Sequence, residues 1–240
     1  ASTLQYEYEI CLKCHSDFAW GNNPPPASTG GFGPLTNQAL EFGMNSTSFH
    51  PVAQATGRTA GVLGGMIGML WTPIGMNTMF CSDCHTKEGD GMPTGPHGSI
   101  FPFNLRNPFT DQYGGRGGGD AQKQQPGDLC FDCHDQNEYW DSTTNGKAMV
   151  GTGFYQNGTN VNLHTQHAWR AWNSANNPWP YRCVNCHSRV PHGYYTKAMI
   201  VLDTDAPPYV VVPGKMSAYN PMPAGYVQTD CTTVAGCHTP

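Results

Sequence analysis

The chain has 240 residues and a formal net charge of −5, with 12 Lys and Arg against 17 Asp and Glu. It contains no basic run that could follow a phosphate backbone, so nucleic-acid binding is disfavoured. Glycine (29) and proline (20) are abundant while large aliphatic residues are sparse, which argues against long helices or a sizeable sheet.

The first recognisable element is the pentapeptide Cys11-Leu-Lys-Cys14-His15. Two cysteines separated by two residues, with a histidine directly after the second, form the attachment signature of c-type haem. The two thiols add across the two vinyl groups of one porphyrin edge, and the adjoining histidine binds the iron as its proximal ligand. A single C-x-x-C is more often a zinc knuckle or a redox dithiol, so one copy alone would decide little.

The same pattern recurs at Cys81 to His85, Cys130 to His134 and Cys183 to His187, with the last two steps 49 and 53 residues long. Zinc ligation needs no histidine after the second cysteine, and histidine accounts for only 10 of the 240 residues. The repetition therefore predicts covalently attached haem c groups. The predicted thioether cysteines are Cys11, Cys14, Cys81, Cys84, Cys130, Cys133, Cys183 and Cys186, and the predicted proximal ligands are His15, His85, His134 and His187.

The segments between these motifs predict little regular structure. Residues 22–31 and 113–120 have the composition of loops, residues 162–172 that of one or two helical turns, and the stretches 197–203 and 209–215 that of a short β-hairpin. Each haem motif is expected on a short helix. The fold class expected is mostly irregular coil with short helices and a small β-hairpin, in a single multihaem cytochrome c domain over 1–240 built around a chain of closely packed haems.

An apolar, glycine-rich and methionine-rich segment occupies residues 61–70. Local packing under a loop is one interpretation, and a subunit contact is the other, because exposed apolar patches mark interfaces. No stretch of the chain approaches 18 apolar residues, so no transmembrane segment is expected.

The C-terminal stretch places Cys231 48 residues beyond Cys183, and ends with Cys237 and His238. A fifth haem is predicted there because the repeat reaches this position, although five residues rather than two separate the cysteines. The longer spacer costs only about 0.8 kcal/mol in closure entropy. A Cys231–Cys237 disulfide is the alternative, natural in an oxidising compartment. The haem-binding units expected lie near 11–15, 81–85, 130–134, 183–187 and 231–238, with five haem c groups in all.

The remaining histidines equal the predicted haems in number. Haem iron has two axial positions, and five histidines lie outside the motifs, so every iron can have a distal histidine. Since His192 lies only five residues after His187, we expect it to reach a neighbouring iron. Bis-histidine ligation gives low-spin irons of lower potential than histidine–methionine ligation. The predicted distal ligands are His50, His97, His164, His167 and His192.

Several of these motifs together resemble a known family. They are SFHPV around His50, CSDCHTKEGDGMPTGPHGS over 81–99, LCFDCHD followed by NLHTQH, and CVNCHSRVPHG over 183–193. In this order they are similar to the OmcE-type subunits of extracellular multihaem cytochrome filaments. The resemblance implies bis-histidine haems in a continuous row, little regular secondary structure, and a subunit interface across which the row continues. The fifth, C-terminal motif departs from that four-haem pattern.

The function expected is long-range electron transfer outside the cell, as the repeating subunit of a homopolymeric filament. Its electron donors and acceptors would be other cytochromes or extracellular minerals. A monomeric periplasmic shuttle to a reductase is the alternative, and a multihaem oxidoreductase is a third that would need an iron with an open position. Haem c attachment outside the cytoplasm predicts a secreted or periplasmic protein whose signal peptide has been removed.

Overall fold

The computed structural model describes residues 3–21, 37–42, 46–57, 75–86, 95–109, 127–139, 154, 162–165, 167, 182–206, 209–210, 218–219 and 231–232. The predicted loops 22–31 and 113–120 lie outside these residues, and so do the apolar segment 61–70, Cys237 and His238.

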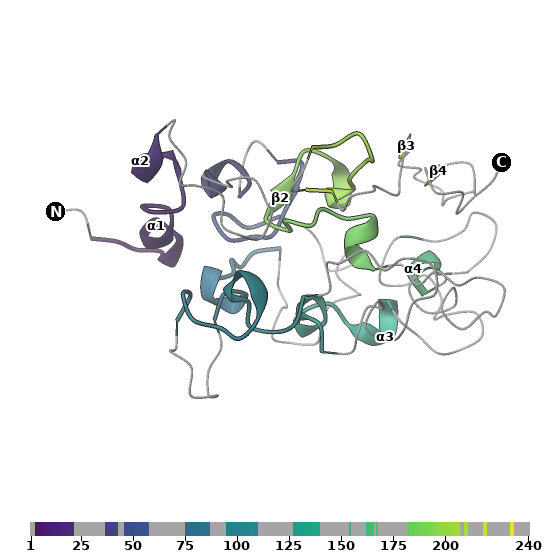
Figure 1. Ribbon diagram of the computed structural model, residues 1–240, viewed down its shortest axis with the longest axis horizontal. Coiled ribbons are helices and arrows are strands. Elements are labelled where there is room, and N and C mark those ends of the chain that lie inside the picture. The colour runs from purple at the N-terminus through teal and green to yellow at the C-terminus, as the bar shows by residue number, and fades with distance from the viewer. Residues whose placement is uncertain are drawn as a thin grey trace.

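Short helices and isolated strand pairs make up the regular structure. In Figure 1, α1 and α2 lie at the left, β2 lies near the centre, and α3 and α4 lie at the right. The elements in chain order are α1 (Glu7–Cys11), α2 (Asp17–Trp20), η1 (Gln38–Leu40), β1 (Ser48–Phe49), η3 (Cys81–Asp83), η4 (Pro102–Asn104), η6 (Leu129–Asp132), α3 (Gln136–Tyr139), α4 (Leu163–Thr165), η8 (Cys183–Asn185), β2 (Gly193–Tyr194), η9 (Lys197–Met199), β3 (Ala218–Tyr219) and β4 (Cys231–Thr232), where η marks a 3-10 helix. The expected class of mostly coil with short helices is confirmed.

Two small antiparallel sheets occur among the described residues, and the first joins distant parts of the chain. In the first, β1 pairs with β2, with Ser48 opposite Tyr194 and Phe49 opposite Gly193. In the second, β3 pairs with β4, with Cys231 opposite Tyr219. The first sheet brings a segment that precedes the second haem motif against one that follows the fourth.

The hairpin predicted near 197–215 is wrong in its first strand. Residues Lys197–Met199 form η9, and the next residue, Ile200, bridges to His187 instead of a hairpin partner. The reason is that Ala198 and Met199 adopt left-handed φ values of 56° and 55°, which turn the chain and bring the Ala198 carbonyl to the His187 ring. Residues 211–215 of the second predicted strand lie outside the described residues.

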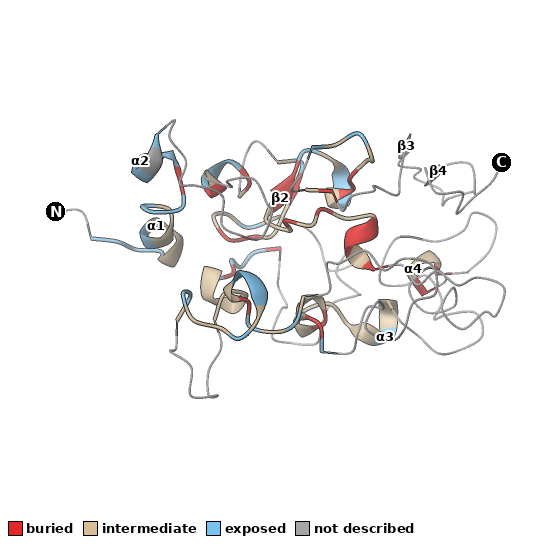
Figure 2. Cartoon of the chain, viewed as in Figure 1, coloured by how far each residue is buried: buried red, intermediate tan, exposed pale blue. Residues whose placement is uncertain are grey.

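Apolar packing centres on the first sheet. Tyr194, Val201 and Val210 form a buried cluster, with Met199 and Tyr209 packed against it. Buried residues follow β2 and the segments beside it in Figure 2. Several fully buried positions elsewhere are polar, including Asp128, Asn162 and Ser188. The apolar cluster of Tyr194, Val201 and Val210 fixes the position of the segment after the fourth motif.

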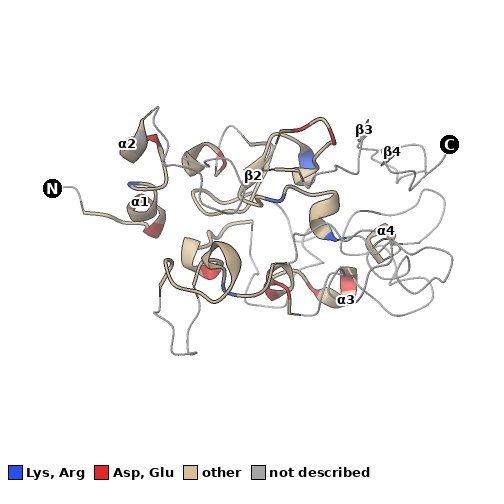
Figure 3. Cartoon of the chain, viewed as in Figure 1, with Lys and Arg blue, Asp and Glu red and all other residues tan. Residues whose placement is uncertain are grey.

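Two expectations from the sequence concern membrane-spanning segments and runs of basic residues. Among the described residues, no helix is long and apolar enough to cross a membrane. The lysines and arginines drawn in Figure 3 stand singly and form no stripe.

Candidate functional site

Each of the four C-x-x-C-H motifs folds into one helical turn. The histidine N–H donates to the carbonyl of the first cysteine at 2.9 Å in all four, and the second cysteine N–H donates to the same carbonyl at 3.1 to 3.4 Å. Local side chains hold the turn: the Phe80 N–H donates to Asp83 at 2.8 Å, and the Arg182 N–H to Asn185 at 2.7 Å. The turn gathers two thiols and one imidazole, which is the donor set that haem c requires.

The motif histidines lie opposite four of the histidines predicted as distal ligands. Each pair joins one histidine of a motif to one from outside the motifs. The ring centroids are 6.2 Å apart for His15 and His97, 6.0 Å for His85 and His192, 6.3 Å for His134 and His50, and 6.2 Å for His187 and His164. His192 lies against His85 of the second motif, whereas His187, its neighbour in sequence, lies against His164.

This spacing fits a metal ion between the two rings. A metal–imidazole bond is about 2.0–2.1 Å and the ring centre lies about 1.1 Å behind the nitrogen, so two imidazoles on opposite sides of one ion have centroids about 6.3 Å apart. The angle between ring planes is 23° and 17° in the first and fourth pairs, numbered by motif, and 57° and 70° in the second and third. The pairs therefore fall into a near-parallel class and a crossed class.

Hydrogen bonds at Nδ1 orient most of these rings. A ring whose Nδ1–H is donated elsewhere presents Nε2 to a metal, and such bonds fix the tautomer and orientation of a ligand. The Nδ1 partners are the carbonyls of Phe103 for His85 (3.1 Å), Ala198 for His187 (2.7 Å), Leu163 for His167 (2.7 Å) and Pro191 for His50, the Tyr139 hydroxyl for His134 (3.3 Å), and the Glu41 carboxylate for His192 (2.8 Å).

Burial keeps these imidazoles in the neutral form that binds metal. Burial first, and neighbouring histidines second, lower the pKa of His134 to about 3 and the pKa of His85 to about 4. Burial also lowers the pKa of His164 well below its ordinary value, and lowers that of His187. Neutral imidazole is the ligand state, so no proton has to be displaced near neutral pH.

The second and fourth motifs share a supporting turn that the sequence analysis missed. Phe103 and Asn104 adopt left-handed φ values six and seven residues after His97, and Ala198 and Met199 do so at the same distance after His192. The Phe103 carbonyl accepts a hydrogen bond from His85, and the Ala198 carbonyl accepts one from His187. Three residues further on, the N–H of Arg106 donates to Cys84 at 2.7 Å and that of Val201 to Cys186 at 2.9 Å. The signal in the sequence is the shared Pro-His-Gly triplet at a constant distance before the turn.

Contacts between cysteines place the motifs in a row. The thiols of Cys11 and Cys81 are hydrogen-bonded, and burial together with this neighbour raises the pKa of Cys81 to about 12. Cys84 lies near Cys133, where burial and the second thiol raise its pKa to about 12.

The third and fourth motifs meet in the same way. The thiol of Cys183 is hydrogen-bonded to Cys130 and, with burial, raises the pKa of Cys130 well above its ordinary value. The contacts therefore join the first motif to the second, the second to the third, and the third to the fourth. None of the eight motif cysteines is in a disulfide, so all of them remain thiols that could form thioethers.

The ligand role of His167 and the haem at the C-terminal motif stay predictions. His167 lies two residues after the end of α4, with its ring centroid 5.9 Å from that of Phe154. At the C-terminal motif the structure describes the backbone of Cys231 in β4, and Cys237 and His238 lie outside the described residues. Within the described residues, no three His, Cys, Asp or Glu side chains converge as a structural zinc site would require.

Comparison with known proteins gives one match. The family model of the doubled CXXCH motif matches residues 73–139, a span that contains the second and third motifs. No curated protein and no solved structure matches the chain. The match supports a multihaem c-type cytochrome, and the doubled motif implies covalently bound haem c.

Proposed function

We propose that this chain is an electron-transfer protein that holds at least four c-type haems, each between two histidines. The observation that carries the proposal is the set of four histidine pairs, every one combining a motif histidine with a distal one at 6.0 to 6.3 Å. When bound, c-type haem supplies reversible one-electron chemistry at its iron. The cysteines would tether each group, and the paired imidazoles would fill both axial positions.

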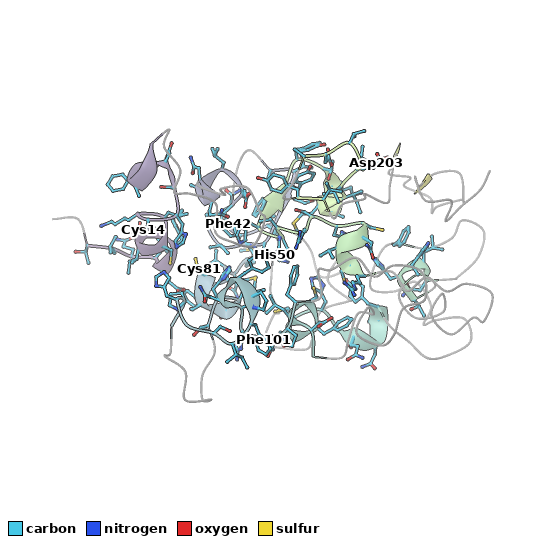
Figure 4. The ribbon with its side chains drawn as sticks, in the orientation of Figure 1. Cys14, Phe42, His50, Cys81, Phe101 and Asp203 are labelled. Carbon is cyan, nitrogen blue, oxygen red and sulfur yellow. The ribbon has the colours of Figure 1, made fainter. Side chains whose placement is uncertain are left out.

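The row of motifs supports conduction over catalysis. Each motif contacts the next through its cysteines, and in Figure 4 Cys14, Cys81 and His50 follow one another from left to right. Electrons can hop between closely spaced cofactors, whereas an enzyme of this class needs an iron with an open position. Two histidines at each of the four described sites disfavour the multihaem oxidoreductase.

We extend the proposal to the repeating subunit of an extracellular filament, with a second copy of the chain as partner. The resemblance to filament cytochromes supports this, and so do exposed apolar side chains near the first motif. Phe18 of α2 is 80% exposed, and Ile10 of α1 and Leu40 of η1 are each 56% exposed. Exposed apolar residues near the first motif fit a subunit contact that would continue the row beyond that motif. A monomeric periplasmic shuttle is the alternative.

Intact mass and electron paramagnetic resonance of the purified protein test the haem sites. Covalent haem survives denaturation, so the mass counts the groups and also decides whether the C-terminal motif carries one. Because the angle between imidazole planes sets the splitting of the iron d orbitals, we expect two classes of low-spin signal, from near-parallel and crossed pairs. Fewer than four haems, or a substantial high-spin fraction, would contradict the proposal.

Electron microscopy of the native secreted protein tests the assembly. Filaments with a repeat of one subunit are expected. Discrete particles at high protein concentration would instead favour the shuttle, without affecting the haem assignment.

A further inference from the structure

A buried carboxylate lies behind one of the candidate axial ligands. The Glu41 Oε2 accepts a hydrogen bond from His192 Nδ1 at 2.8 Å, and Oε1 accepts one from the Tyr209 hydroxyl at 2.7 Å. The Glu41 side chain is 8% exposed, against 21% for His192, and the two residues are 151 positions apart in sequence. A carboxylate this buried is costly unless its oxygens are hydrogen-bonded, and here both are.

The surrounding residues hold this contact in place. Gly193 passes so close to the Glu41 backbone that a Cβ at this position would lie 1.9 Å from the Glu41 carbonyl oxygen. Phe42, which follows Glu41 in the chain, packs with its ring centroid 4.5 Å from that of His192. The carboxylate and the imidazole are thus positioned together by the segment 38–42 and the start of β2.

The other oriented histidines have neutral partners. His85 and His187 donate to backbone carbonyls, and His134 is next to a tyrosine hydroxyl. The Nδ1 of His164 is buried with no hydrogen-bond partner. Among the contacts between described residues, His192 is the histidine whose Nδ1 meets a carboxylate.

We propose that Glu41 is a positioning residue that lowers the reduction potential of the iron between His85 and His192 below that of the other three; this inference rests on the proposed function. The carboxylate draws the Nδ1 proton of His192 toward itself, so the imidazole donates more strongly through Nε2. The ferric ion carries one more positive charge than the ferrous ion and gains more from this donation. Reduction adds one electron to the iron, and no bond forms or breaks.

The consequence for the row is a step in energy at its second position. The second motif contacts the first through Cys81 and the third through Cys84, so an electron passing along the row must cross this site. Transfer of an electron to a haem of lower potential than its neighbours is uphill in free energy. Electrons would therefore stay on the haems on either side of this site.

Potentiometric titration of the holoprotein and its Glu41→Gln variant tests the inference. Glutamine keeps the size and one acceptor oxygen but removes the charge. We expect one haem to become easier to reduce by about tenfold in its equilibrium constant, which is 59 mV for a one-electron couple, with the other potentials unchanged. The affected haem should be the one that becomes high-spin in His192→Ala. Identical potentials in wild type and Glu41→Gln would overturn the inference.

Glu7→Gln is the matched control. The Glu7 carboxylate accepts hydrogen bonds from the Ser82 N–H at 3.3 Å and the Ser82 hydroxyl at 3.1 Å, inside the same motif. This variant removes an equal charge near the same haem but leaves the His192 contact intact, so we expect a smaller rise. Equal rises in the two variants would mean a through-space charge effect and would overturn the role of the His192 hydrogen bond.

Tyr209→Phe provides a second variant that keeps the charge of Glu41. Without the tyrosine hydroxyl, the carboxylate interacts more strongly with His192, so the potential of the same haem should fall. An unchanged or higher potential would count against the inference even where Glu41→Gln fails to fold. If the wild-type haems do not titrate as one-electron couples, the proposed function fails together with this inference, whereas unchanged potentials in the variants overturn the inference alone.

Discussion

Gly193→Ala should separate the segment 38–42 from the start of β2, and with it Glu41 from His192. The added Cβ would lie 1.9 Å from the Glu41 carbonyl oxygen and 3.0 Å from the Phe49 Cβ, whereas ordinary contacts begin at 3.4 Å. Relief requires a movement of about 1.5 Å, which would stretch the 2.8 Å contact between Glu41 and His192 beyond hydrogen-bonding range. Overpacking alone costs about 1–3 kcal/mol, and the lost bond to a charged group adds to it.

Guanidinium unfolding of the holoprotein, followed through the low-spin haem absorbance, measures this cost. We expect a loss of about 2–4 kcal/mol in the free energy of unfolding, with a raised potential at one haem. Gly57→Ala is the control, because its Cβ would meet no atom within 4 Å and only backbone strain at φ 66° opposes it. A Gly193→Ala protein with wild-type stability and potentials would refute the close approach on which this reasoning depends.

Three further predictions concern the histidine sites. His192→Ala should leave the iron bound by His85 five-coordinate, which would appear as one high-spin haem per chain in absorption and resonance spectra. Ala198→Gly should stabilise the holoprotein by about 1 kcal/mol in denaturant unfolding, because a left-handed alanine costs about 1–2 kcal/mol and glycine does not. The free energy of unfolding should fall as the pH drops from about 6.5 toward 4. In the folded chain burial keeps the pKa values of His85 and His134 at about 4 and about 3, so over this range these histidines bind protons only in the unfolded chain. A denaturation midpoint equal at pH 7 and pH 4.5 would contradict this.

Local chemistry explains why the sequence predicts the haem motifs well. Attachment of one group needs two thiols and one imidazole within a single turn, so five consecutive residues contain the whole requirement. The structure gives the four motifs the same hydrogen-bonded turn, as that local requirement suggests. The expectation of short helices in mostly irregular chain likewise follows from composition, because glycine and proline limit helix and strand length anywhere in a fold.

The predicted hairpin shows where local patterns mislead. The β-branched and apolar residues near 200 favour a strand, yet Ala198 and Met199 turn in the left-handed region so that a carbonyl meets His187. Propensity is a weak prior, and a long-range contact outweighs it here.

The sequence by itself determined where the four complete C-x-x-C-H motifs lie, and it predicts five distal histidines, as many as the five predicted haems. Only the tertiary structure decided which histidine faces which. His192 lies opposite His85 because β1 pairs with β2 and carries the segment after the fourth motif back to the second. Glu41 belongs to no motif, and only its buried contact with His192 distinguishes it from other acids. The pairing of His85 with His192 depends on contacts between segments more than a hundred residues apart, which spacing along the chain does not encode.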